Sequence, residues 1–409
     1  MAGLTLCAMN GMSVLISGTG IGGPSLAFWL KAAGFQPTLV ERAPKLRCGG
    51  YVIDFWGLGY DIAELMGLER DLNRVGYHVQ ELRVVNGAGR RVTGFGTKVF
   101  TELTEGRYVS LQRSDLSRLI FDKIKNSVEV IFDDEILWLV EGAEGVHAHF
   151  RKGGERRFDL VVGADGLHSA VRELAFGSDN CFEQDLGYAV AAFEAAGYRP
   201  RDENAFVIYG RPGQMVARFA KRDDRTLFLF VFANGDALPT DVAKQKALLR
   251  ARYENGEWET TTILEALDRA DELYFDRVSQ IRMPRWSNGR IALIGDAAFC
   301  VSLTAGQGSA LAMLSAYVLA GELAKAQGRH HEAFAAYENF LRDFIRKKQD
   351  GAERFASTFA PKTPFGLWFR NMVIRSLILP GLARFAVGRD VMDRLVLPNY
   401  CWPSLKDLR

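Results

Sequence analysis

Three glycines near the amino terminus have the spacing of a phosphate-binding turn. Gly18, Gly20 and Gly23 follow the apolar run 14–17, and the run 24–33 after them is typical of a helix. In such a turn the first glycine permits a tight bend, the second lets the backbone approach a pyrophosphate, and the third lets the helix pack on the strand. The N–H groups at the start of the helix favour phosphates. The pattern predicts a dinucleotide-binding unit, with a glycine-rich turn that holds no ligand as the alternative.

Three acidic residues each follow directly after a further apolar strand. The strand 38–40 ends at Glu41, where a carboxylate can accept hydrogen bonds from ribose hydroxyls. Two other apolar strands lead into Asp165 and Asp296. Ligands of open α/β sheets bind at the carboxyl ends of strands. Taken alone, however, either aspartate could simply cap a helix.

Together these motifs resemble those of the single-component FAD-dependent monooxygenases, the family with the p-hydroxybenzoate hydroxylase fold. The motifs are Gly18-x-Gly20-x-x-Gly23, Gly163-Ala164-Asp165-Gly166-x-x-Ser169-x-x-Arg172 and Gly295-Asp296-Ala297-Ala298. The resemblance covers nearly the whole chain, with the motifs in the family's order. The segments 47–54 and 111–116 look closer to the tetracycline-inactivating branch of that family.

The resemblance implies a role for each matched position. Glu41 would hold the adenosine ribose, Arg113 would contact the FAD, and Asp296 would bind the ribityl chain. Asp165 belongs to a motif associated with both FAD and NAD(P)H. The implied cofactor-binding set is Gly18, Gly20, Gly23, Glu41, Arg42, Gly50, Arg113, Asp165, Asp296, Gly306 and Gly308.

The segment 305–308 also has a physical interpretation. A reduced flavin carries negative charge near N1 and O2, and a helix that begins near Gly306 would present N–H groups and its positive dipole end to that charge. Glycines let the backbone come close to the ring. Relatives usually have histidine where this chain has Phe299, and a proline that the stretch 301–304 lacks. We expect this difference to affect the substrate side more than FAD binding.

The resemblance implies an NAD(P)H-consuming hydroxylase. NAD(P)H would reduce the flavin, and a C4a-hydroperoxyflavin would deliver one oxygen atom of O2 to a small, aromatic and fairly apolar substrate. No side chain stands out as a general base, so the sequence names no catalytic residue. The alternatives are a flavin-dependent dehydrogenase or reductase and a non-enzymatic flavoprotein that sequesters a ligand. The tryptophan motif of flavin halogenases is absent.

The elements that must position these residues suggest an α/β fold. We expect a three-layer Rossmann-like FAD-binding domain at 12–178, with a β insertion near 76–111, which resumes at 281–345. An inserted antiparallel β-sheet substrate domain would occupy 179–280, and a C-terminal helical region would cover the pocket from 346 to 409.

The strand-rich insertion supplies the candidate pocket residues. In the family this sheet forms the floor of the substrate pocket. The candidates are Phe193, Tyr209, Met215 and Phe219, with Leu303 from the loop beside the flavin. Because side chains alternate along a strand, only about half of the sheet candidates can face the pocket; core packing is the alternative for each. Arg211 and Arg218 are the nearest cations for an acidic substrate group, or are solvent-facing hairpin residues.

Length, composition and charge exclude several classes of protein. The 409 residues suggest two or three domains, and 48% hydrophobic with 24% charged residues excludes a disordered chain. A net charge of +2 gives no electrostatic case for nucleic acid. The resemblance implies a small-molecule substrate and O2 as partners, and we expect a monomer or dimer.

Five scattered cysteines without a C-x-x-C pair predict free thiols in a reducing cytoplasm, with neither disulfides nor a metal site. His147 and His149 share one face of a strand, where exposed histidines are favoured over a metal pair. The most apolar stretch, 372–387, is interrupted by charges and falls short of the ~20 residues of a membrane span. Met12 is an alternative to Met1 as the start of the chain.

Overall fold

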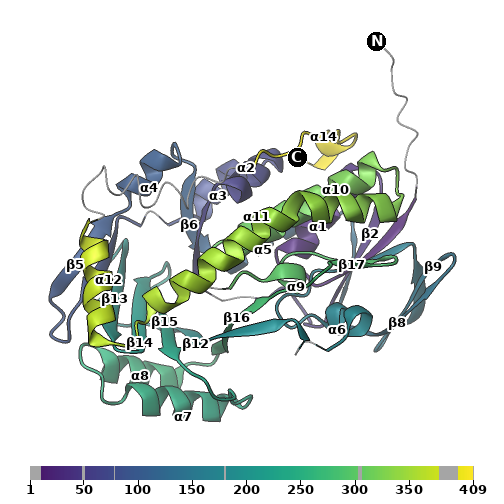
Figure 1. The fold of residues 1–409 in the computed structure, drawn as a ribbon. Helices are drawn as coiled ribbons and strands as arrows, with labels where there is room; N and C mark the ends of the chain where they lie inside the picture. Colours follow the sequence, from purple (N-terminus) through teal and green to yellow (C-terminus); the bar gives the residue numbers. More distant parts are fainter. Residues whose placement is uncertain are drawn as a thin grey trace.

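A parallel sheet carries the amino-terminal glycine turn. The computed structural model describes residues 11–47, 51–77, 79–178, 181–302, 306–376 and 395–408 (Figure 1). The sheet has the order β17-β18-β11-β1-β2-β7, and only the pair β17–β18 is antiparallel. Its strands are β1 (Ser13–Ser17), β2 (Gln36–Glu41), β7 (Glu129–Phe132), β11 (Leu160–Gly163), β17 (Ser287–Asn288) and β18 (Ile291–Leu293). The apolar residues of β1 and β11 are fully buried, as expected for parallel strands covered on both faces.

Helices and a second sheet cover this parallel sheet. The three-stranded antiparallel sheet of β8 (Ile136–Gly142), β9 (Gly145–Phe150) and β10 (Gly154–Phe158) lies against β1 and β11. The helices of this part of the fold are α1 (Gly22–Ala32), α2 (Leu58–Leu65), α3 (Glu69–Val75), α5 (Arg113–Asp122), α6 (Ala170–Phe176), α9 (Asp296–Phe299), α10 (Gly308–Lys325) and α11 (His330–Phe359). Helix α10 packs between α1 and α11. This is the three-layer arrangement that the sequence predicted.

The second large sheet has seven strands in the order β16-β12-β15-β14-β13-β4-β5. The strands are β4 (Glu81–Val85), β5 (Arg91–Gly96), β12 (Glu183–Ala196), β13 (Ala205–Arg211), β14 (Gln214–Ala220), β15 (Arg225–Ala233) and β16 (Tyr274–Ile281). The expected β insertion therefore joins the substrate-domain sheet. It does so through a parallel pair, β13–β4, so the sheet is mixed where we expected it to be wholly antiparallel. A parallel pair is possible because a long stretch of chain separates the two strands.

The two faces of this sheet are covered by different parts of the chain. The outer face is covered by α7 (Val242–Tyr253) and α8 (Thr260–Arg269). We call the opposite surface the inner face; Tyr51 and Tyr77 pack on it. Its side chains include Tyr188, Val190, Ala192, Met215, Ala217, Phe219, Leu227 and Val231. A two-stranded sheet of β3 (Val52–Trp56) and β6 (Tyr108–Gln112) follows Tyr51, and α4 (Lys98–Leu103) precedes β6.

The carboxyl-terminal part is helical. Helix α11 is continuous across residue 346, so the expected boundary there falls inside one helix. Helix α12 (Pro364–Ser376) packs on β5 and β13, beside the seven-stranded sheet (Figure 1). The segment 395–408, with α14 (Leu405–Leu408), returns to α1, where Trp402 contacts Trp29. Within the described ranges, no helix has the length and apolarity to cross a membrane.

Candidate FAD site

The turn between β1 and α1 can be built only with glycine at two positions. Gly18 has φ +102°, and a Cβ on it would lie 2.6 Å from the carbonyl oxygen of Ala164. A Cβ on Gly23 would lie 1.9 Å from the oxygen of Gly18. Both distances are far below van der Waals contact. The glycines therefore permit the close approach of α1 to β1 and β11 that a phosphate-binding turn requires.

The amino terminus of α1 is free to bind an anion. Its N-cap residue, Ile21, makes no side-chain hydrogen bond to the helix, and the first turn has no acidic residue. Gly20 leaves open space at this end, with Arg113 Nη2 3.7 Å from the position of its missing Cβ. Uncapped N–H groups, the helix dipole and a guanidinium thus meet at one point, which suits a pyrophosphate.

Glu41 lies at the carboxyl end of β2, beside this turn. The backbone N–H and hydroxyl of Thr19 donate to its Oε2 at 2.9 and 3.0 Å, and the N–H of Ala43 donates to its Oε1 at 3.0 Å. The carboxylate is therefore held in place and keeps lone pairs for further donors, as ribose binding requires. Arg42 beside it is exposed. Gly50, another predicted contact, lies outside the described residues.

Asp165 has a structural task of its own. Ser17 Oγ and the N–H of Val171 donate to its Oδ2, each at 3.2 Å. Ser169 also donates to it and, in addition, caps α6. Burial raises the pKa of Asp165. Its described hydrogen bonds tie β1 to the start of α6, so the capping alternative accounts for this carboxylate in the structure.

Arg172, which ends the same motif, connects the two aspartate motifs. Its side chain is fully buried, and Nη1 donates to the carbonyl of Ala297 at 2.9 Å. A second donor, Nη2, reaches the carbonyl of Leu167. The guanidinium thus fixes the segment after Asp296 relative to the segment after Asp165. Spacing alone did not reveal this role.

Asp296 is the half-buried carboxylate of the site. Burial raises its pKa, while the nearby Arg113 guanidinium acts in the opposite direction. Its Oδ1 lies 3.6 Å from the Cβ position of Gly308, at the start of α10. The same environment raises the pKa of the Cys300 thiol, mainly by burial. Asp296, Arg113 and the starts of α1 and α10 therefore converge, as predicted for a site that spans an extended cofactor.

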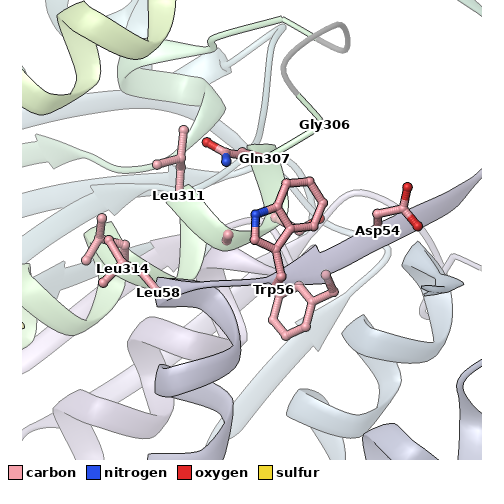
Figure 2. Close-up of a pocket in the computed structure, with 10 residues that line it drawn as sticks. Asp54, Trp56, Leu58, Gly306, Gln307, Leu311 and Leu314 are labelled. Carbon is pink, nitrogen blue, oxygen red and sulfur yellow. The ribbon is translucent and has the colours of Figure 1, made fainter. Parts of the chain in front are cut away.

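The start of α10 is also open to an anion. Gln307 at the N-cap makes no side-chain capping bond, and the first turn contains no acid. Gly306 has φ +63° and nothing within 4 Å of its Cβ position. Figure 2 shows Trp56 of β3 below Gln307, with Asp54 to one side. The small pocket between them, about 10 Å³ in volume, is lined by Asp54, Phe55, Trp56, Leu58, Gly306, Gln307, Ser309, Ala310, Leu311 and Leu314.

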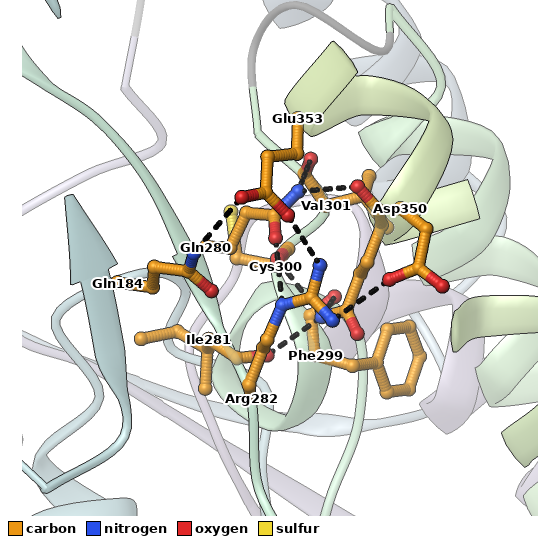
Figure 3. Close-up of polar contacts among 10 residues, drawn as sticks. Gln184, Gln280, Ile281, Arg282, Phe299, Cys300, Val301, Asp350 and Glu353 are labelled. Carbon is orange, nitrogen blue, oxygen red and sulfur yellow. Dashed lines mark hydrogen bonds and ion pairs between the residues drawn. The ribbon is translucent and has the colours of Figure 1, made fainter. Parts of the chain in front are cut away.

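Two buried glutamine side chains hold the segment after Asp296 by hydrogen bonds to its backbone (Figure 3). Gln349 of α11 donates to the carbonyls of Ile281 and Cys300 at 2.7 and 3.3 Å. Gln280 of β16 donates to the carbonyls of Val301 and Gln349 at 3.2 and 2.8 Å. Sequence reasoning missed both glutamines, because nothing in their spacing marks them. They fix the path of the chain toward the start of α10.

Phe299, where relatives have histidine, is a core residue. Its side chain is 2% exposed, and its ring lies 4.6 Å from that of Trp286. The substitution therefore extends the apolar core. Leu303, the predicted pocket residue of this loop, lies outside the described residues.

The four sheet candidates for the substrate pocket lie on opposite faces of the seven-stranded sheet, two on each face. Met215 and Phe219 are on the inner face, and Phe219 packs edge-on against Tyr77 at 5.3 Å. Phe193 and Tyr209 are on the outer face, buried under α7 and α8. For these two the core alternative is correct, because alternation along β12 and β13 turns them away from the inner face.

The two candidate cations are placed elsewhere as well. Arg218 is buried on the outer face, where it pairs with Asp202 at 2.7 Å and Glu259 at 2.9 Å. Arg211 donates to the carbonyl of Asn255. Neither arginine faces the inner surface of the sheet, so the structure gives no support to a contact of either with a substrate bound there.

The described residues fit FAD. The uncapped starts of α1 and α10 suit its pyrophosphate and the N1–C2=O edge of its ring, Glu41 suits the adenosine ribose, and the half-buried Asp296 suits the ribityl hydroxyls. In the same ranges, no group of three or more His, Cys, Asp or Glu residues is arranged to hold a metal ion. Fold and site together define an FAD-binding flavoprotein.

Comparison with known sequences identifies the family. The family described as "FAD binding domain" matches residues 11–350. A "Flavin-dependent monooxygenase" from an unknown prokaryotic organism is 34% identical over 340 residues, covering 82% of this chain and 87% of the relative. A "Flavin-dependent monooxygenase" of Legionella longbeachae is 30% identical over 398 residues, covering 95% and 98%. The chain belongs to the family of FAD-dependent monooxygenases, as the motifs predicted.

Solved structures agree with this assignment. Tetracycline destructase Tet(55) has a TM-score of 0.81 at 30% identity, covering 95% of this chain and 98% of its own. Tet(51) has a TM-score of 0.80 at 28% identity, covering 95% and 100%. Klebsiella pneumoniae HpxO, complexed with FAD and uric acid, shares the fold, with a TM-score of 0.74 at 24% identity and coverage of 89% and 93%.

Proposed function

We propose that this monooxygenase uses NAD(P)H to hydroxylate a small, fairly apolar aromatic molecule. The observation that carries the proposal is the inner face of the seven-stranded sheet, whose apolar side chains include Met215, Ala217 and Phe219. Tyr51 packs on this same face. Burial raises the pKa of its hydroxyl, with smaller and opposite effects from the nearby Arg113 and Asp296. A ring bound there would lie on an apolar floor beside the FAD site.

The residues of the chain would prepare the cofactor and exclude water. The bound, reduced flavin supplies the oxygen chemistry by activating O2. The start of α10, with no acidic residue in its first turn, would stabilise the negative charge of the reduced ring. Arg172 and Gln349 would keep the loop between Asp296 and α10 in position. The proposal includes the transfer of one oxygen atom of O2 to the substrate, as the resemblance implies.

Several sequence-based expectations remain part of the proposal. They are the use of NADH or NADPH, a cytoplasmic location, a monomer or dimer, and the division into an FAD-binding part at 12–178 and from 281 onward and a substrate part at 179–280. The tetracycline destructases act on tetracycline by their name, but this chain has the apolar residues Ala191, Ala192, Met215 and Val216 in the strands of the proposed substrate sheet. Ala192 and Met215 lie on the inner face, which favours a less polar substrate.

The test uses purified protein loaded with FAD. NADPH and NADH oxidation and O2 uptake are recorded with a panel of hydroxylated and amino-substituted aromatics of one to four rings. We expect at least one compound to accelerate both rates together and to gain a hydroxyl group. NAD(P)H oxidation that is equally fast without O2 would instead support the reductase alternative. Tight binding of a compound with no turnover under any condition would support the sequestering alternative.

A further inference from the structure

A second, larger cavity lies where α11 ends and α12 begins. Its volume is about 430 Å³, within the usual range for small-molecule sites. The residues that line it are Leu186, Tyr188, Glu353, Pro361, Lys362, Thr363 and Gly366. Leu186 and Tyr188 belong to the inner face of the seven-stranded sheet, so the cavity borders the face on which the substrate is proposed to lie.

Lys362 gives this cavity a positive charge. Its Nζ lies 5.4 Å from the centre of the Tyr188 ring and 3.8 Å from the Cβ position of Gly187. Among the residues that the structure describes, no carboxylate lies within ion-pair distance of Lys362. The ammonium group is therefore placed beside an aromatic ring and keeps its donors for another acceptor.

Glu353 is the opposite charge in this cavity, and it is already engaged. Its Oε2 lies 3.3 Å from Arg282 Nη2, and its Oε1 accepts a hydrogen bond from Gln184 Nε2 at 3.3 Å (Figure 3). Arg282 is held in turn by Asp350 at 2.9 Å and by the side chain of Gln280. Glu353 is thus part of a polar network that passes through Arg282 and Gln280 to the carbonyl of Val301.

A second cation lies over the same face of the sheet. Arg370 of α12 is 7% exposed, and both of its terminal nitrogens lie 3.3 Å from the Cβ position of Gly210 on β13. Gly210 pairs with Met215, a residue of the inner face. The absence of a side chain at position 210 leaves room for this guanidinium. Lys362 and Arg370 are thus two cations on the α12 side of the inner face.

We propose that Lys362 and the Tyr188 ring form a subsite for an anionic group, a carboxylate or phenolate, on an otherwise apolar aromatic substrate. The inference deepens the proposed function and rests on it. It replaces Arg211 and Arg218, which the structure removed from consideration, with a cation on the correct face. The cavity is also connected, through Glu353, Arg282 and Gln280, to the segment 299–301.

The test compares three ligands of one shape and different charge. 2-Naphthoate, neutral 2-naphthamide and cationic 2-naphthamidine are titrated into the FAD-loaded enzyme by calorimetry at pH 7.5 and low salt. We expect the naphthoate to bind about tenfold more tightly than the amide, and the amidine most weakly. Lys362→Gln should remove the preference for naphthoate without changing affinity for the amide. Lys362→Arg should restore it, and added salt should weaken it.

Lys244→Gln provides the matched control, because Lys244 is exposed on α7 at the outer face. Equal preference for naphthoate in the wild type and in Lys362→Gln would overturn the subsite, as would tightest binding of the amidine. These results are independent of turnover. A preference for naphthoate that depends on Lys362, in an enzyme that hydroxylates no aromatic compound, would uphold the anionic subsite and refute the proposed function instead.

Discussion

Replacing Asp296 should separate cofactor affinity from protein stability. Asp296 is half-buried, faces the start of α10 and is the proposed acceptor for a ribityl hydroxyl. A hydrogen bond to a charged acceptor contributes about 1.5–3 kcal/mol, so Asp296→Ala should weaken FAD binding by about 10- to 150-fold. Titration of apoprotein with FAD, followed by flavin fluorescence, measures the change. Asp122→Asn, at an exposed position of α5, is the control.

The apoprotein should respond in the opposite direction. Burial of an ionised carboxylate disfavours the folded apoprotein, as the raised pKa of Asp296 indicates. Asp296→Asn should therefore raise the Tm of the apoprotein while it weakens FAD binding. Because the folded pKa exceeds the unfolded value, the folded state binds more protons between the two values. The apoprotein should thus lose stability as pH rises from about 4 through the folded pKa, and Asp296→Asn should reduce that loss. Unchanged FAD affinity in both variants would refute the reasoning.

Three further substitutions test the scaffold. Gly23→Ala places a methyl group 1.9 Å from a carbonyl oxygen and should lower the free energy of unfolding by about 3 kcal/mol and abolish FAD binding; Gly351→Ala, with open space around it, should be tolerated. Phe299→His buries a polar ring against Trp286 and should lower stability by about 1–3 kcal/mol in urea unfolding, contrary to what the histidine of relatives suggests. Trp402→Ala should cost about 1–3 kcal/mol by detaching the carboxyl-terminal segment from α1, and an unchanged Tm would contradict that contact.

The cofactor side of the site could be predicted from the sequence because it depends on local patterns. A turn that only glycine can form, and acids that directly follow buried strands, are properties of a few neighbouring residues. Glu41 and Asp296 therefore lie where the motifs placed them, at strand ends beside uncapped helix starts. For Asp165 the sequence left a helix-capping role and a cofactor contact open; the hydrogen bonds from Ser17 and Val171 support a structural role, and the cofactor contact stays a prediction.

The substrate side could not be predicted in the same way. Period-two alternation assigns Phe193 and Met215 to faces of their strands, but it does not say which face α7 and α8 will cover. Arg172 reaches a carbonyl 125 residues away, and Gln349 reaches one 68 residues away. Such contacts depend on the tertiary fold and leave no local signal. The same is true of Lys362, which becomes notable only because the connection between α11 and α12 places it over the Tyr188 ring.

Isotope labelling tests the central claim most directly. The FAD-loaded enzyme is supplied with NADPH or NADH, an aromatic compound that accelerates O2 uptake, and 18O2, and the product is analysed by mass spectrometry. The account predicts one hydroxyl oxygen derived from O2 in each product molecule, with one NAD(P)H consumed per turnover. Product oxygen derived from water, or complete recovery of the consumed O2 as hydrogen peroxide with every compound tested, would contradict it.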